Sequence, residues 1–258
     1  MTDEKGLEAL LTMPPYSQGE QERKNLLLPL IRQGARKACT NPHIRSMYAK
    51  LGIVPERMQE LHEVPAVPVR MFKSFDLSTV DRSEVTRVLR SSGTTAQHAS
   101  VVPLNKATAS NQTRALRSIL GAYLGDKRRV MLVIDHPGVN SPSRELTARG
   151  AGVRGLSIYA KDIVYLLREE GGKLVLDTEA VEKARRLAEV QEVYVFGFTF
   201  IIWSVFCKEM EERQLKLDLP RAVVFHGGGW KKLRDQKVSR EVFSQRLAGL
   251  LGCPGRDK

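Results

Sequence analysis

The apolar run at residues 130–134 constrains the fold of this chain more than any other feature. Its five consecutive apolar residues, VMLVI, stand between charged flanks. A strand-length segment that is apolar at every position is typical of a parallel strand buried on both faces. Further strands are expected at residues 192–197 and 221–225, and helices at 178–188 and 200–212 alternate with them. We therefore predict an α/β fold with mostly parallel sheets covered by helices.

The N-terminal part, residues 1–65, is expected to be a helical lead-in packed on a main α/β domain at residues 66–258. Leucines lie close to one helical face within residues 20–39, and Pro29 predicts a break or kink near the start of that helix. A second helix is expected at residues 43–51, with Gly52 as its C-terminal stop.

Turn and cap residues predict several local elements of the main domain. Residues 67–72 (VPVRMF) are expected to form a strand, residues 143–150 a short helix ending in glycines, and residues 153–159 another strand. A hairpin is predicted at residues 165–176, with Glu-Gly-Gly at its turn. The expected helix caps are Asn105, Thr178 and Ser239, and the last helix is expected to stop at Gly252.

The segment SSGTT lies between two apolar runs, so the expected local order is strand, loop, strand and then helix. It places four hydroxyl side chains and a glycine in five positions. Such residues allow a turn to direct several donors at one phosphate. An ordinary polar hairpin turn explains the same residues equally well. The candidate phosphate-binding residues are Ser91, Ser92, Gly93, Thr94 and Thr95.

A second glycine-rich segment, HGGGWKK, follows the strand expected at residues 221–225. Glycines after a strand permit close approach of the backbone to a flat ligand or a phosphate, and the alternative is a flexible turn. Trp230 offers a ring for stacking, and Lys231 and Lys232 offer charges that pair with anions. We favour a nucleotide-binding loop that contains His226, Gly227, Gly228 and Gly229.

The composition is that of an ordinary globular protein, with 42% hydrophobic and 27% charged residues among 258. The N-terminal sequence MTDEKGLEAL is unlike a signal peptide, and no uninterrupted apolar run is long enough to span a membrane. A cytoplasmic location is therefore expected. The formal net charge of +12 suggests an anionic partner such as a nucleotide, coenzyme A or an acidic protein. Nucleic acid is a minor alternative, because the basic residues form no compact patch.

The three cysteines lie too far apart in the sequence to form a CxxC metal or redox pair. Cys39 and Cys207 are interpreted as small apolar residues on helices. Cys253 lies in a tail that looks exposed, but no base motif flanks it, so an inert thiol is favoured. No metal-binding residue is assigned, and no side chain is assigned to catalysis.

Four segments in the same order resemble the acyl-protein synthetase (LuxE) branch of the adenylate-forming, acyl-activating enzymes. They are PVRMFKS at residues 68–74, SSGTT at 91–95, VFGFTF at 195–200 and HGGGWKK at 226–232. HGGGWKK is the most specific of the four. The resemblance runs from about the first helix to the end of the chain, and it implies the fold of the N-terminal large domain of adenylate-forming enzymes.

The resemblance implies an ATP-dependent ligase that activates a carboxylic acid, expected to be a fatty acid, as an acyl-adenylate for transfer to a thiol or protein acceptor. ATP and Mg²⁺ would be required, and an acyl carrier, acyltransferase or reductase protein is the expected partner. Residues 91–95 would bind the phosphates of ATP, and residues 226–229 would line the adenine side. The acyl pocket is assigned to Phe196, Gly197 and Phe198, because an acyl chain needs an apolar surface.

Two features depart from the family pattern. Ala96 follows SSGTT where the family commonly has glycine, and alanine at a positive φ would cost about 1 kcal/mol. The family's Tyr-Gly-x-x-Glu loop, its ribose-binding aspartate and its acylated cysteine are not visible after Gly229, so the chain is expected to lack the family's C-terminal part. The alternative function is a truncated, non-catalytic homologue that acts as a binding or scaffold subunit for an acyl-transfer partner.

Overall fold

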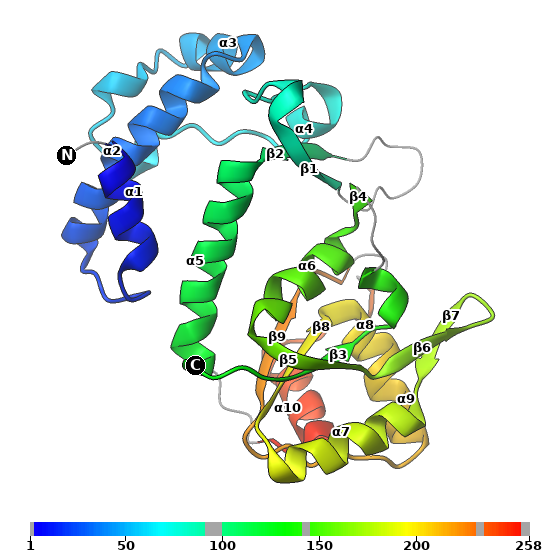
Figure 1. Cartoon of the computed structure of the whole chain (residues 1–258). Helices are drawn as coiled ribbons and strands as arrows, with labels where there is room; N and C mark the ends of the chain where they lie inside the picture. The colour runs from blue at the N-terminus through cyan, green and yellow to red at the C-terminus, as the bar shows by residue number, and fades with distance from the viewer. Residues whose placement is uncertain (1–2, 91–99, 141–144, 231–234, 254–258) are drawn as a thin grey trace. The chain divides into compact units, whose positions relative to one another are not determined.

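The chain folds into two compact units, seen in a computed structural model that describes residues 3–90, 100–140, 145–230 and 235–253 (Figure 1). The first unit contains residues up to 122 together with residues 143–148. The second contains residues 123–142 and 149–258. The division into residues 1–65 and 66–258 stays a prediction.

The N-terminal segment of the first unit is helical, as expected. It contains α1 (Asp3–Thr12), α2 (Glu20–Ala38) and α3 (Pro42–Lys50). The helix α2 runs through Pro29 as one element, so the expected break is absent. The predicted helix at residues 43–51 is confirmed as α3. Asn41 caps it by accepting the N–H of His43 at 3.1 Å, and Gly52 follows its end at a φ of +65°.

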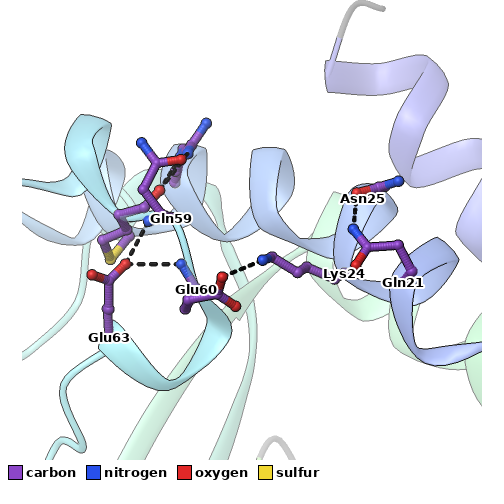
Figure 2. A network of polar contacts seen from close by, with 8 residues as sticks. Gln21, Lys24, Asn25, Gln59, Glu60 and Glu63 are labelled. Atoms are coloured by element: carbon purple, nitrogen blue, oxygen red, sulfur yellow. Dashed lines mark hydrogen bonds and ion pairs between the residues drawn. The ribbon is translucent and has the colours of Figure 1, made fainter.

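A small apolar cluster and a polar network hold this helical segment together. The buried members of the cluster are Ala35, Ile44, Tyr48 and Met58. Figure 2 shows the network, in which Lys24 of α2 forms an ion pair with Glu60. The carboxylate of Glu63 accepts the N–H groups of Glu60, at 2.8 Å, and of Gln59. These backbone hydrogen bonds lower the pKa of Glu63. The short helix η1 (Pro55–Arg57) precedes this network, and Glu63 is the last residue of the short helix η2 (Leu61–Glu63).

The strand expected at residues 67–72 is wrong, because this segment turns into the short helix α4 (Met71–Ser74). The N–H groups of Met71 and Phe72 bond to the carbonyl oxygens of Pro68 and Val69 at 2.9 and 3.2 Å. Proline has the φ of a first helical turn and needs no donor there. The helical turn therefore begins at Pro68.

The two strands and the helix of the predicted order strand, loop, strand and helix are confirmed in the first unit, and the segment between the strands, residues 91–99, lies outside the described residues. After η3 (Arg82–Glu84), β1 (Val85–Arg90) pairs antiparallel with β2 (Val101–Asn105) and parallel with β4 (Glu145–Leu146). The helix α5 (Lys106–Leu124) follows β2 at once. Asn105 is its cap, since the Oδ1 atom of Asn105 accepts the N–H of Thr108 at 2.9 Å.

The second unit is built on a four-stranded parallel sheet, which confirms the predicted α/β fold class (Figure 1). Leu132, Val164, Val195 and Val224 stand in register across it. The central strand, predicted from its unbroken apolar run, is fully buried. The order of the strands is β5 (Ala160–Tyr165), β3 (Arg129–Ile134), β8 (Val193–Phe198) and β9 (Val223–Gly227).

Helices cover both faces of this sheet. Side chains that alternate along β8 point to opposite faces, so Val195 and Phe196 meet different helices. Val195 belongs to the main core with the helices α7 (Thr178–Val190), α9 (Lys208–Glu212) and α10 (Arg240–Leu251). On the other face, the helix α6 (Ala148–Leu156) packs against β8, where the hydroxyl of Tyr194 donates to the carbonyl oxygen of Leu156 at 2.8 Å.

The strand expected at residues 153–159 is also wrong. These residues complete α6 and the short helix η5 (Ser157–Tyr159), and the strand β5 begins directly afterwards. Of the helix expected at residues 143–150, residues 148–150 form the start of α6, residues 145–146 form β4, and residues 143–144 lie outside the described residues. Glycine explains the error: a Cβ on Gly152 would lie 2.8 Å from the Cζ atom of Phe196. Glycine permits close packing of α6 on the sheet, although in the sequence it resembles a helix stop.

The remaining predicted elements of the second unit are confirmed, with small shifts. The hairpin consists of β6 (Leu167–Glu170) and β7 (Lys173–Leu176), with Gly171 and Gly172 at positive φ, and it projects from the unit (Figure 1). The cap of α7 is Asp177 and not Thr178, since its Oδ1 atom accepts the N–H of Ala180 at 3.0 Å. Ser239 caps α10 as predicted, and Gly252 ends it.

The helix expected at residues 200–212 is divided into three parts. The short α8 (Thr199–Ile201) leads into a π-helical segment, η6 (Ile202–Cys207), and then into α9. The short helix η4 (Pro137–Asn140) follows β3. In the part of the chain that the structure describes, no helix combines the length and the apolar character needed to cross a membrane.

Candidate functional site at the carboxyl edge of the parallel sheet

The carboxyl ends of β3, β8 and β9 meet at one edge of the parallel sheet. Ile134, Gly197 and His226 are aligned across the three strands. A Cβ on Gly197 would lie 2.9 Å from the Cβ of Ile134, so this strand position requires glycine for close packing. Ligands of parallel α/β sheets bind outside the carboxyl ends of the strands. The residues that follow these strands are therefore the candidate site of the second unit.

Thr199 joins the ends of β8 and β9. Its side chain is buried, and its Oγ1 atom lies 3.1 Å from the Nδ1 atom of His226. The same oxygen lies 3.2 Å from the carbonyl oxygens of both Gly227 and Gly228. A buried hydroxyl with three partners holds the backbone of the glycine segment in place. The sequence interpretation did not identify this residue.

The three glycines of the predicted nucleotide-binding loop have different structural roles. Gly228 has a φ of +77°, and a Cβ at this position would lie 2.9 Å from the Cδ1 atom of Phe198. Gly227 and Gly229 have open space where a Cβ would be. We expected the glycines to let a ligand come close to the backbone. At Gly228 the group that comes close is the ring of Phe198. The loop lies directly on the residue assigned to the acyl pocket.

Trp230 packs against other rings of the second unit. Its ring centroid lies 5.6 Å from that of Trp203 and 6.2 Å from that of Phe243, in edge-to-face geometry. The guanidinium of Arg246 lies 4.1 Å above the ring of Trp203. Trp230 is therefore part of an aromatic cluster of the second unit, and its stacking on a ligand stays a prediction. Lys231 and Lys232, the other predicted anion-pairing residues of this segment, lie outside the described residues.

An ion pair that the sequence interpretation missed lies at the end of β3. The carboxylate of Asp135 is 3% exposed and accepts a hydrogen bond from the Nε atom of Arg149 at 2.8 Å, with a second bond from Nη2. The N–H of His136 donates to the same carboxylate at 2.8 Å. A buried charge needs such partners to offset the loss of hydration. The sequence contained one signal for this ion pair, an aspartate directly after an apolar strand.

The residues assigned to the acyl pocket form an aromatic wall at the end of β8. The rings of Phe196 and Phe198 are 5.6 Å apart at an interplanar angle of 70°. Phe196 is buried beneath Gly152 of α6, whereas Phe198 is partly exposed. Phe198 is therefore the member of this pair that a ligand can reach.

The predicted phosphate-binding residues, Ser91 to Thr95, lie outside the described residues. The ends of β1 and β2, Arg90 and Val101, contribute to the lining of a groove in the first unit with a volume of about 760 Å³. This groove has apolar walls and basic residues, including Lys73 of the segment PVRMFKS. Its other lining residues are Phe72, Ser74, Phe75, Asp76, Ser78, Val80, Arg82, Val85, Val88 and Pro103.

The cysteines of the second unit are not activated thiols. Burial raises the pKa of Cys207 to about 12, and burial also raises the pKa of Cys253. Cys253 packs against the main core and is only partly exposed, so its expected inertness has a physical cause. Among the residues that the structure describes, no three His, Cys, Asp or Glu side chains gather in a way that would hold a metal ion.

Comparison with known proteins decides the family. The model of the family "Acyl-protein synthetase, LuxE" matches residues 14–257. The chain belongs to this acyl-protein synthetase family. This finding confirms the resemblance carried by the four sequence segments.

A curated relative and two solved structures are also similar to this chain. The chain is 24% identical over 249 residues to the long-chain-fatty-acid–luciferin-component ligase of Vibrio harveyi, covering 90% of this chain but only 60% of that protein. Two crystal structures of 2-hydroxyisobutyryl-CoA ligase in complex with 2-HIB-AMP and CoA align with TM-scores of 0.64 and 0.66, at 16% and 17% identity. The alignments cover 93% of this chain and about half of those chains. They show that the fold is shared.

Proposed function

We propose that this chain takes part in the ATP-dependent activation of a carboxylic acid, and that the acid is a fatty acid. The acyl-adenylate then passes its acyl group to a thiol or protein acceptor. The observation that carries the proposal is the joining of β8 and β9 by Thr199, which brings His226, the glycines and Phe198 together at the ligand-binding edge of the sheet. Membership of the acyl-protein synthetase family supports the same activity.

In this proposal the segment His226 to Gly229 binds the adenine side of ATP. Gly227 and Gly229 have open space beside their backbone, so a flat ring can approach them closely. His226 is exposed, and Thr199 holds its Nδ1 atom beside these glycines. Phe198 lies directly beneath Gly228 and offers an apolar surface for the acyl chain.

The hydroxyl segment, Ser91 to Thr95, is proposed to bind the phosphates of ATP. Its role rests on residue type and on the family resemblance. Mg²⁺ commonly binds through one or two carboxylates and the phosphates of its nucleotide. Because the described residues supply no cluster of metal ligands, we propose that Mg²⁺ enters with ATP.

The proposed reaction has two steps. A carboxylate oxygen of the acid attacks the α-phosphorus of ATP, the bond to the β-phosphate oxygen breaks, and pyrophosphate leaves. A thiolate then attacks the acyl carbon, and AMP leaves with the electrons of the carbon–oxygen bond. Two anions must approach each other in the first step, so hydrogen-bond donors and positive charge lower its barrier. The net charge of +12 favours such anionic substrates.

Two measurements test the proposal, saturable binding of ATP and carboxylate-dependent exchange of labelled pyrophosphate into ATP. Thr94→Val is expected to weaken ATP binding about tenfold, because it removes a hydroxyl donor from the segment. Thr108→Val, at an exposed position of α5, is the matched control and is expected to bind ATP normally. Absence of saturable ATP binding by the unaltered chain would contradict the proposal.

The basic composition supports a second candidate, a non-catalytic subunit that binds an acidic acyl carrier, acyltransferase or reductase protein. The same titration separates the two functions. A scaffold subunit is expected to bind an acidic acyl carrier protein with a strong dependence on salt and to show no response to ATP.

A further inference from the structure

One ring of α10 contacts both ends of the glycine segment, residues 226–230. The centroid of the Phe243 ring lies 4.9 Å from that of His226, at the start of this segment. The same centroid lies 6.2 Å from that of Trp230, at its end. Both distances fall in the range of roughly 4.5–7 Å over which aromatic rings attract each other. Phe243 is only 4% exposed, so this ring is a buried part of the second unit.

Phe243 is itself held in a fixed position. It lies in the first turn of α10, where its N–H donates to the carbonyl oxygen of Ser239 at 3.1 Å. The ring of Trp203 stacks on it, with centroids 6.1 Å apart and an interplanar angle of 26°. The guanidinium of Arg246 lies over Trp203 and donates to both carboxylate oxygens of Glu211, at 2.7 and 2.6 Å. The ring of Phe243 can therefore restrain the glycine segment without moving with it.

The glycine segment needs such restraint because three of its five residues are glycines. Glycine loses more conformational freedom on ordering than any other residue. The hydroxyl of Thr199 holds the carbonyl oxygens of Gly227 and Gly228, within the segment. The ring of Phe243 restrains the two residues on either side of the glycines, His226 and Trp230. A ligand of this backbone then meets an ordered segment, and its apparent affinity is not reduced by a disordered fraction.

We propose that Phe243 is a positioning residue for the nucleotide. By holding both ends of residues 226–230, its ring keeps the glycine backbone in the arrangement that binds the adenine side of ATP. The effect on ATP rests on the proposed function, whereas the ordering of the segment does not. Phe243 acts through His226 and Trp230, so the proposal requires no contact between Phe243 and the nucleotide.

Hydrogen exchange of the full chain, measured by mass spectrometry, tests the ordering. Phe243→Leu keeps an apolar side chain but loses the ring, so the amides of residues 226–230 are expected to exchange about tenfold faster, the effect of losing a ring pair. Trp230→Leu removes one of the two end contacts at a partly exposed residue and is expected to give a smaller acceleration. Unchanged exchange of this segment in either leucine variant would overturn the proposal, so the test does not depend on the folding of Phe243→Leu.

Leu251→Val is the matched control for Phe243→Leu. Leu251 is fully buried in the main core about two turns further along α10. The valine variant is expected to lower the urea midpoint of unfolding by a similar amount, because it also removes core packing. Exchange of residues 226–230 is expected to stay unchanged in this variant. Equal acceleration in Leu251→Val and Phe243→Leu would show that the effect comes from general destabilisation, which contradicts the proposal.

Titration of the same chains with ATP tests the positioning role. The affinity of Phe243→Leu for ATP is expected to fall by up to about tenfold, because ATP must then supply the order that the ring supplied. Added ATP is also expected to slow exchange of residues 226–230 more in this variant than in the unaltered chain, whereas Leu251→Val is expected to behave like the unaltered chain. Faster exchange in Phe243→Leu with unchanged ATP affinity would refute the positioning role. Absence of ATP binding by the unaltered chain would refute the proposed function, and the exchange measurement would still decide the ordering.

Discussion

Replacing Gly228 by alanine is expected to lower the free energy of unfolding by about 2–5 kcal/mol, the sum of two effects. A residue with a Cβ costs about 1–2 kcal/mol in the left-handed region, and Gly228 has a φ of +77°. The added Cβ would also lie 2.9 Å from the Cδ1 atom of Phe198, and overpacking of this kind costs about 1–3 kcal/mol. The ring of Phe198 cannot move away freely, because Phe196 packs against it with centroids 5.6 Å apart.

Urea unfolding followed by tryptophan fluorescence measures this loss, since Trp203 and Trp230 lie in the neighbouring aromatic cluster. Gly229→Ala is the matched control, because its Cβ would meet open space and its φ is not left-handed. This control is expected to change stability by about 0.5 kcal/mol or less. Phe198→Leu separates the two causes: combined with Gly228→Ala it is expected to recover about 1 kcal/mol relative to the sum of the single changes. If Gly228→Ala and Gly229→Ala cost the same, the reasoning is refuted.

Two further changes test other parts of the second unit. Asp135→Asn is expected to lower the free energy of unfolding in urea by about 2 kcal/mol, since it removes the charge that pairs with the partly exposed Arg149, whereas Asp126→Asn at an exposed position is expected to have no effect. The stability of the unaltered chain is expected to fall between about pH 9 and pH 12. The unfolded Cys207 thiol ionises near its ordinary pKa of 9.0, while burial holds the folded thiol protonated up to about 12. The loss is up to about 1.4 kcal/mol per pH unit, and pH-dependent unfolding of Cys207→Ala is expected to show a shallower slope in the same range.

The sequence predicted those elements that depend on local chemistry. The run at residues 130–134 is apolar at every position. A strand with one face in water would expose half of these apolar side chains, so the run predicts a strand that is buried on both faces. The caps Asn105 and Ser239 act on N–H groups only three residues away, so their effect is visible in the sequence. Gly171 and Gly172 determine the turn of their hairpin in the same local manner.

The two wrong strand predictions have different causes, a contact between distant residues at Gly152 and local backbone geometry at Pro68. Gly152 resembled a helix stop, but it allows α6 to pack against Phe196, which follows 44 positions later in the numbering of the chain. Residues 67–72 were expected to form a strand, whereas the proline at position 68 begins a helical turn. The first outcome depends on packing that no local pattern contains, and the second depends on the φ of a single proline.

The candidate site was predicted in its segments but not in its connections. Residues 196–198 and 226–229 were assigned separately, and the structure shows that Gly228 packs on Phe198 and that Thr199 bonds to the glycine carbonyls. Thr199 was missed because its partners are 27 to 29 residues away, and only the register of β8 with β9 brings them together. Ser91 to Thr95 lie outside the described residues, so their phosphate-binding role stays a prediction.

The contacts at the carboxyl edge have a common consequence for the proposed activity. Thr199 holds the glycine carbonyls, Phe198 supports Gly228, and Arg149 holds the carboxylate of Asp135. Each contact joins residues from different elements of the second unit, so the folding of this unit already holds the backbone of Gly227 and Gly228 in place. A site that is ordered in advance loses less entropy when it binds, and its dipoles do not need to reorient as charge develops. Changes that loosen these contacts are therefore expected to weaken nucleotide binding even where no altered atom touches the nucleotide.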